Sequence, residues 1–291
     1  MRVLIIGASG FVGEKVYNIL SKTFEVIGTY STKKKYKFEQ LDISDKNSVL
    51  KIIRRIRPDV VIHTAGITNV DFFEENPEEI RRVNVQGTKN IIDGCLETDS
   101  KLVYISTDYV FDGEMGDYKE EDKPSPISAY GNAKLEEEEL VKKSNLKYLI
   151  LRISVPYGGN SRDNKQTFEK WVINNLRDNK EIKVIDDQFN TPTLIDDIAN
   201  AIKKLIELKR TGVYHVTGSE RISRYDFAVK IAEVFNLNKN FIKRVKTKDL
   251  SWKAKRPKDS SLNISKLKNE NIYMSNINEG LNKMKKQLGF L

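Results

Sequence analysis

A tyrosine and a lysine four residues apart, Tyr130 and Lys134, are the residues of this chain whose types and spacing best suit chemistry. On a helix, side chains at i and i+4 leave the same face, so the two would point together. An ammonium close to a phenol stabilises the phenolate and lowers the tyrosine pKa from about 10 toward neutrality. A tyrosine in that state exchanges protons with a carbonyl or alcohol oxygen, which predicts acid–base chemistry here.

A second polar group, Ser106-Thr107-Asp108, follows the apolar run that begins at Leu102. If that run is a strand of an open α/β sheet, these residues lie at its carboxyl end, where such sheets bind ligands. Thr107 could then donate a second hydrogen bond to the oxygen that Tyr130 serves. Each pattern alone is common by chance, but their order along a sheet predicts one site formed by Thr107, Tyr130 and Lys134.

A glycine-rich turn precedes both groups in the chain. The apolar run Val3–Ile6 passes into Gly7-Ala8-Ser9-Gly10-Phe11-Val12-Gly13 and then into a helical pattern. Glycines let the backbone approach a pyrophosphate, and the free N–H groups at a helix N-terminus stabilise its charge. The pattern predicts a dinucleotide-binding loop in which Gly7, Gly10, Phe11, Val12 and Gly13 contact the cofactor.

The end of the second expected strand indicates which dinucleotide binds. An acid at this place selects NAD by binding the adenosine ribose, whereas this chain reads Ser31-Thr32-Lys33-Lys34-Lys35. Hydroxyls and lysines there favour a 2′-phosphate, so we expect NADPH, with Ser31 and Lys33 as contacts. A solvated basic turn would read the same way, so NADH stays open. Asp42 is expected to meet the adenine amine.

Short apolar runs alternate with helical patterns over the first 155 residues, as in a parallel sheet with crossover helices. The strands expected there are Val3–Ile6, Val26–Tyr30, a short edge strand at Tyr36–Leu41, Val60–Thr64, Leu102–Ser106 and Tyr148–Ile153. The helices expected between them are Lys15–Ser21, Asn47–Arg57, Glu78–Leu96 and Tyr130–Lys143.

Beyond Gly158 the alternation weakens, with helices expected over Thr167–Arg177, Asp196–Leu208 and Tyr225–Phe235 and an isolated strand at Val213–Thr217. We therefore predict an α/β fold, a Rossmann-type doubly wound parallel sheet with a smaller mixed C-terminal lobe. Residues 1–155 would bind NAD(P) and residues 156–291 the substrate, with the chain returning to the sheet near residues 193–217.

Composition excludes several classes of protein. The 291 residues are 39% hydrophobic and 31% charged, as in an ordinary globular protein. No apolar run is long enough to span a membrane, and no signal-peptide core follows Met1, so we expect a cytoplasmic protein without a membrane partner. Cys95, His63 and His215 are too few and too scattered for a metal site. The net charge of +9 comes from lysines spread along the chain near acids, which disfavours a nucleic-acid partner.

Taken together, these motifs resemble the extended short-chain dehydrogenase/reductase superfamily and, within it, the dTDP-4-dehydrorhamnose reductase family. The resemblance covers nearly the whole chain, and its most specific stretches run from Ile105 to Gly113 and from Tyr130 to Leu135. The other matching stretches are His63-Thr64-Ala65-Gly66, Thr68-Asn69-Val70-Asp71, Val83 to Thr88, Leu151-Arg152, Tyr157-Gly158, Asp187-Gln188-Phe189, Gly212 to His215, Arg256-Pro257 and Ser265-Lys266-Leu267.

The resemblance implies reduction of a 4-keto-6-deoxy sugar carried on a nucleoside diphosphate. Tyr130 would protonate the C4 oxygen as hydride arrives, Lys134 would hold the nicotinamide ribose, and Thr107 would orient the keto group. Further cofactor contacts implied by the resemblance are Asp42, Ile43, Ala65, Gly66, Thr68 and Asn84. The substrate contacts it implies are Thr107, Asp108, Val155 and Arg256, the last as partner of the diphosphate, because a guanidinium can bind two oxygens at once.

One departure and one alternative stay open. Val155 stands where the family usually has a tryptophan that packs on the sugar, so the sugar is not identified. A close branch of the superfamily, the regulatory β subunit of methionine adenosyltransferase, also binds NADP and shares the Tyr-x-x-x-Lys pattern. The Thr68-Asn69-Val70-Asp71 and Asp187-Gln188-Phe189 elements favour the reductases. A homodimer is compatible with these patterns.

Overall fold

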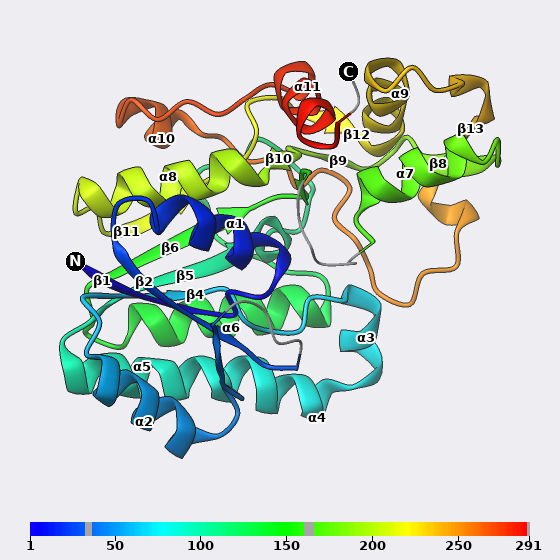
Figure 1. Ribbon diagram of the computed structural model, residues 1–291. Helices are drawn as coiled ribbons and strands as arrows, with labels where there is room; N and C mark the ends of the chain where they lie inside the picture. Colours follow the sequence, from blue (N-terminus) through cyan, green and yellow to red (C-terminus); the bar gives the residue numbers. More distant parts are fainter. Residues whose placement is uncertain (33–36, 160–165, 290–291) are drawn as a thin grey trace.

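Seven parallel strands form the sheet at the centre of the molecule (Figure 1). The computed structural model describes residues 1–32, 37–159 and 166–289. The strands, in their order across the sheet, are β11 (Gly212–His215), β6 (Tyr148–Ile153), β5 (Lys101–Thr107), β4 (Val60–His63), β1 (Arg2–Ile6), β2 (Glu25–Tyr30) and β3 (Glu39–Gln40). This order confirms the predicted doubly wound α/β fold.

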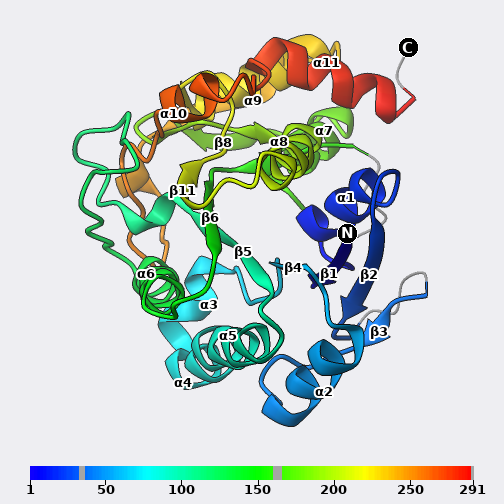
Figure 2. The same cartoon turned by 90° about the vertical axis from the view of Figure 1, so that its left-hand side faces the viewer.

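The sheet is buried on both faces, which explains why its strands are apolar without alternation. Successive residues of β1 face opposite sides: Val3 and Ile5 belong to one core cluster, and Leu4 and Ile6 belong to another. Two helices, α1 (Phe11–Leu20) and α8 (Ile195–Glu207), cover the first face, as Figure 2 shows. The second face is covered by α2 (Lys46–Ile56), α5 (Gly87–Thr98) and α6 (Ala129–Lys142).

Short helical segments fill the connections beside the sheet. They are α3 (Val70–Glu75), α4 (Pro77–Ile80), a π-helical stretch over Arg81–Gln86 and a 3₁₀ turn over Asp108–Val110. The helix predicted as continuous over Glu78–Leu96 therefore changes type twice before it ends.

A second lobe lies above the carboxyl edge of the sheet and has a core of its own (Figure 1). Its strands are β7 (Pro156–Tyr157), β8 (Ile182–Ile185), β9 (Phe189–Asn190), β10 (Thr193–Leu194), β12 (Ile222–Ser223) and β13 (Ile242–Val245), which pair two by two. Its helices are α7 (Phe168–Arg177), α9 (Arg224–Val234) and α11 (Ile277–Gln287), with 3₁₀ turns over Lys239–Phe241 and Thr247–Asp249. The short helix α10 (Ser265–Asn269) instead buries Leu267 in the first core and packs beside β11.

The strand expected by itself at Val213–Thr217 is β11, which pairs with β6 at the edge of the main sheet. Helix α8 also packs on that sheet, so both segments contribute to the first core although they follow residue 155 in the chain. The division at residue 155 stays a prediction. Within the described ranges, no helix combines the length and the apolar character needed to cross a membrane.

Candidate active site

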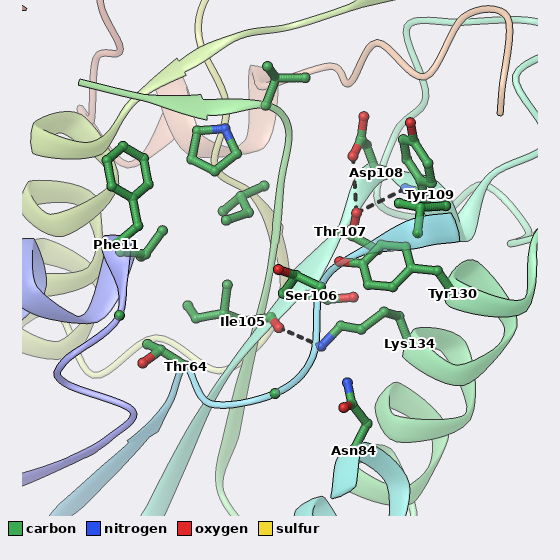
Figure 3. A pocket seen from close by; sticks show the side chains of 18 of the residues that line it. Phe11, Thr64, Asn84, Ile105, Ser106, Thr107, Asp108, Tyr109, Tyr130 and Lys134 are labelled. Carbon is green, nitrogen blue, oxygen red and sulfur yellow. Dashed lines mark hydrogen bonds between the residues drawn. The ribbon is translucent and has the colours of Figure 1, made fainter. Parts of the chain in front are cut away.

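A cavity of about 480 Å³ opens at the carboxyl ends of the sheet strands, beside the neighbouring strands β1 and β4. In a doubly wound sheet this is where the strand order reverses and where ligands bind. Its volume is typical of a small-molecule site. Figure 3 shows side chains from β5 and α6 turned toward it. The predicted site residues that line it are Gly10, Phe11, Val12, Gly13, Ala65, Gly66, Thr68, Asn84, Thr107, Asp108, Tyr130, Lys134 and Val155.

Other predicted cofactor contacts do not line this cavity. Gly7 forms the turn at the end of β1 with a φ of +88°. Ser31 is exposed after β2, and the carboxylate of Asp42 accepts hydrogen bonds within its own turn. Ile43 is buried in the core beneath the sheet. Lys33 lies outside the described residues.

The glycine loop between β1 and α1 leaves room for a phosphate group. Gly10 precedes the first turn of α1 and has no side chain to cap its N–H groups. A Cβ on Gly13 would lie 2.3 Å from the carbonyl oxygen of Gly7 and 2.8 Å from Oγ1 of Thr64, so a larger residue does not fit. Uncapped N–H groups and the helix dipole stabilise a bound phosphate. These residues therefore fit the pyrophosphate of a dinucleotide.

Asn84 reaches the cavity from the π-helical stretch Arg81–Gln86. Its Oδ1 accepts a hydrogen bond from the Ile67 N–H at 3.0 Å, and its Nδ2 donates to the Ile67 carbonyl at 3.2 Å. The two bonds hold the loop after β4 that carries Ala65. Single π-helical turns occur frequently at functional sites, and this one positions a residue of the predicted cofactor channel.

Tyr130 projects from the first turn of α6 toward the end of β5 (Figure 3). The rings of Phe73 and Tyr109 contact its ring edge-on, with centroids 5.0 and 5.8 Å away. Burial raises the pKa of Tyr130, and the hydroxyl of Thr107 opposes this only in part. The predicted lowering of this pKa by Lys134 is wrong for the protein without ligand, because burial of the phenolate is the dominant cause and it raises the pKa. Tyr130 is thus a protonated phenol at neutral pH.

Lys134 lies one turn further along α6 and is buried. Its Nζ donates to the carbonyl oxygen of Ile105 at 3.0 Å and lies 4.2 Å from the centroid of the Tyr104 ring. Burial lowers the pKa of Lys134, while the carboxylates of Glu137 and Glu138 raise it. The ammonium therefore depends on acidic neighbours on its own helix.

The hydroxyl of Thr107 is fixed by its neighbours in the chain. Its Oγ1 donates to Oδ1 of Asp108 at 3.1 Å and accepts from the Tyr109 N–H at 3.2 Å. Asp108 also accepts from the hydroxyls of Ser154 at 2.8 Å and Ser260 at 2.5 Å. Burial raises the pKa of Asp108, and the three hydroxyls oppose that rise. The result is a buried network that holds Thr107 beside Tyr130.

Arg224 is a site residue that the sequence patterns did not predict. It lines the main cavity and a second hollow of about 340 Å³ in the C-terminal lobe. Trp171, Trp252 and Arg256 line the second hollow but not the main cavity. Arg224 is the first residue of α9, where the helix dipole disfavours a cation, and this signal was available from the sequence.

Arg256 is not in the main cavity. Its guanidinium binds both carboxylate oxygens of Asp71, at 2.8 and 3.2 Å, and lies 4.1 Å from the centroid of the Trp252 ring. This pairing holds the pKa of Asp71 below its usual range. In the described part of the chain, no group of three or more His, Cys, Asp or Glu side chains is arranged to hold a metal ion.

The model of the RmlD substrate binding domain matches residues 1–289 of this chain. The chain belongs to the RmlD substrate-binding domain family. This match confirms the predicted family. The fold of this chain also agrees with that of solved relatives.

Among the relatives of this RmlD family member is the dTDP-4-dehydrorhamnose reductase of Aggregatibacter actinomycetemcomitans, 33% identical over 282 residues and covering 91% of this chain and 92% of the relative. The methionine adenosyltransferase 2 subunit beta of Bos taurus is 32% identical over 272 residues, or 91% of this chain and 81% of the relative. The crystal structure of dTDP-4-dehydrorhamnose reductase from Bacillus anthracis in complex with NADP has a TM-score of 0.90 and 32% identity, covering 98% of this chain and 99% of that one.

Proposed function

We propose that this chain is an NADPH-dependent reductase of the 4-keto group of a nucleoside diphosphate sugar. The chain is an oxidoreductase of the RmlD family, and the similar reductase from Bacillus anthracis was crystallised in complex with NADP. The observation that carries the proposal is that Thr107, Tyr130 and Lys134 line one cavity with the glycine loop of α1.

In this proposal Tyr130 holds the proton that the keto oxygen takes up. Its raised pKa keeps the phenol protonated, which suits a donor rather than a base. Thr107, fixed by Asp108, orients the carbonyl, and Lys134 binds the ribose of the cofactor. When bound, the reduced nicotinamide supplies a hydride to the carbonyl carbon. Tyr130 gives its proton to the oxygen, so that an alcohol forms, and solvent then reprotonates the phenolate.

The nucleoside diphosphate end of the substrate fits the second hollow. Arg224 lines both spaces, so a diphosphate bound there could carry its sugar into the cavity beside Tyr130. Arg256 offers a second guanidinium, and Trp171 and Trp252 offer ring faces for a base or sugar. This assigns Arg224 to the site in addition to Arg256.

The direct test mixes the purified protein with NADPH and a panel of 4-keto nucleotide sugars. Loss of nicotinamide absorbance with at least one sugar is expected, with one alcohol formed per NADPH consumed. Val155 leaves the ring substituents open, so the panel should include sugars other than the rhamnose precursor. Absence of turnover across the panel, with NADPH bound, would contradict the proposal.

A second candidate function is a regulatory subunit of methionine adenosyltransferase. The bovine β subunit, 32% identical to this chain, favours it. It predicts NADP binding without turnover and a stable complex with the catalytic subunit. Co-purification of such a complex, together with a failed sugar panel, would select this alternative over the reductase.

A further inference from the structure

We propose that Glu137 is a positioning residue that keeps Lys134 charged and directed toward the cavity. The proposal rests on the proposed function for the role of Lys134, but it concerns a carboxylate that the mechanism above does not use. Glu137 lies one turn after Lys134 on α6, with its Oε2 3.8 Å from the lysine Nζ. The side chains of both residues are buried, at 1% and 9% exposure.

Lys134 needs a counter-charge because it has little contact with water. Among the described residues, the acceptor that its ammonium meets at ordinary hydrogen-bond distance is the neutral carbonyl of Ile105. An ammonium removed from water is costly unless a negative charge is close. The acidic residues on its own helix are the groups that raise the pKa of Lys134 against the effect of burial.

Glu138, the other candidate counter-ion, is already engaged elsewhere. Its two oxygens accept from Arg152 at 2.9 and 2.8 Å, and Oε1 also accepts from Ser106 at 2.6 Å. Lys142 lies 3.5 Å from the same carboxylate. Burial would raise the pKa of Glu138, but Arg152 and Ser106 hold it below its usual range. This leaves Glu137 as the carboxylate whose charge is available to Lys134.

Only one of the two carboxylate oxygens of Glu137 makes a hydrogen bond of ordinary geometry among the described residues. Its Oε2 accepts from the hydroxyl of Thr88 at 2.7 Å, and that hydroxyl contacts Nε2 of His63 at 3.0 Å. Its Oε1 and the hydroxyl of Tyr104 are both buried without a hydrogen bond of ordinary geometry in the described ranges. Buried polar atoms rarely lack a hydrogen-bond partner, and each exception calls for an explanation.

The remaining titratable groups around the pair do not supply a second negative charge. Tyr130 and Glu138 face it from α6, Tyr104 from β5 and His63 from β4. Burial lowers the pKa of His63 to about 3, so the imidazole is neutral. Burial raises the pKa of Tyr104, so its phenol stays protonated. Arg152, from β6, neutralises Glu138.

Removing the charge of Glu137 lowers the pKa of both Lys134 and Tyr130. Without the charge of Glu137, Lys134 loses its proton more easily, because a nearby anion favours the ammonium. Tyr130 also ionises more easily, because Glu137 is among the groups that raise its pKa. Both changes move the loss of function at alkaline pH to lower pH.

The first experiment measures NADPH affinity against pH for the wild type, Glu137→Gln and the matched control Glu139→Gln. Glu139 is on the same helix but pairs with Lys142 and Lys143 at the surface. We expect the alkaline fall in affinity to begin about one pH unit lower in Glu137→Gln and to be unchanged in the control. If a sugar substrate is found, the alkaline fall in kcat should also begin about one pH unit lower in Glu137→Gln. Superimposable curves for Glu137→Gln and the wild type would overturn the proposal.

The second experiment is a double-mutant cycle of stability that requires neither substrate nor cofactor. Lys134→Gln leaves Glu137 as a buried charge without its partner, so adding Glu137→Gln should restore part of the lost stability. We expect coupling of about tenfold in the unfolding constant measured with urea. Additive losses would overturn the proposal. If Glu137→Gln alone does not fold, folding of the double variant supports the proposal and failure of both contradicts it.

These readouts separate the two proposals. A failed sugar panel together with the predicted shift in NADPH affinity would reject the reductase while retaining Glu137 as the counter-ion. Turnover of a sugar, with no shift in the pH dependence of either NADPH affinity or kcat, would retain the reductase and reject Glu137 as the counter-ion.

Discussion

The proposed active site has a cofactor end in the main cavity and a substrate end in the second hollow, and the two are built in different ways. The cofactor end is made mainly of backbone, namely the turn around Gly10 and Gly13, the ends of the sheet strands and the first turn of α1. The substrate end is made of side chains, including Arg224 and Arg256, that come from separate segments of the C-terminal lobe. The first kind of site is encoded over short stretches of sequence, whereas the second exists only once the chain has folded.

The largest expected effect is a loss of turnover on changing Tyr130, which lies where the cofactor end and the substrate end meet. Tyr130→Phe removes one hydroxyl and should lower kcat by about 10²–10⁴-fold, the range for a lost general acid. NADPH affinity should hardly change. The exposed Tyr273→Phe serves as the control. More than half of the wild-type turnover in the Tyr130 variant, with hydride transfer rate-limiting, would remove Tyr130 from this role.

The next effect belongs to the substrate end alone. Arg256→Ala should raise KM for the nucleotide sugar by about 30- to 150-fold, the value of one lost guanidinium–phosphate contact. The affinity for NADPH should stay the same, because Arg256 does not line the main cavity. Lys253→Ala, in the same segment, is the control, since that lysine is exposed and pairs with Glu75. Equal losses for sugar and cofactor would mean that the ends are not separate.

The cofactor end should instead be sensitive to the smallest added side chain. Gly13→Ala places a methyl group against the Gly7 carbonyl and should destabilise the protein by about 1–3 kcal/mol in urea unfolding without ligand. Gly10→Ala is the matched control, because its φ is −79° and its Cβ comes no closer than 3.3 Å to another group. If both variants lose the same stability, the close approach at Gly13 is not what restricts that position.

The smallest effect concerns a strained position that lines the main cavity. Val155 has a φ of +38°, a conformation in which a β-branched residue is an outlier. Glycine relieves such strain but adds chain entropy, so Val155→Gly should leave stability within about 1 kcal/mol of the wild type. Val213→Gly, in the regular strand β11, should lose more. A larger loss at Val155 than at Val213 would show that side-chain packing outweighs the strain.

The sequence was sufficient to predict the parts of the fold that local patterns encode. The strand predicted at Tyr148–Ile153 is β6 with the same bounds, and the doubly wound order of the sheet follows from alternating strands and helices. The C-terminal lobe was harder. Helix α11, Ile277–Gln287, buries only a narrow stripe within a Lys-rich stretch, and β8 and β13 are short strands whose pairing joins distant segments.

The candidate site shows the same limit. The spacing of Tyr130 and Lys134 placed both at one cavity, but the sign of the tyrosine pKa shift was wrong. Spacing along a helix does not reveal how much water a side chain loses, and here that loss is the dominant cause. Ser260 was also missed, because its bond to Asp108 joins residues 152 positions apart.

The π-helical stretch that carries Asn84 also limits how this protein can change in length. A residue in an α-helix turns by about 100° about the axis, so deleting one position between residues 81 and 86 to restore an α-helical turn would rotate Asn84 away from Ile67. The loop that it holds would lose both hydrogen bonds at once. Substitutions on the outer face of this stretch should therefore be tolerated far better than insertions or deletions within it.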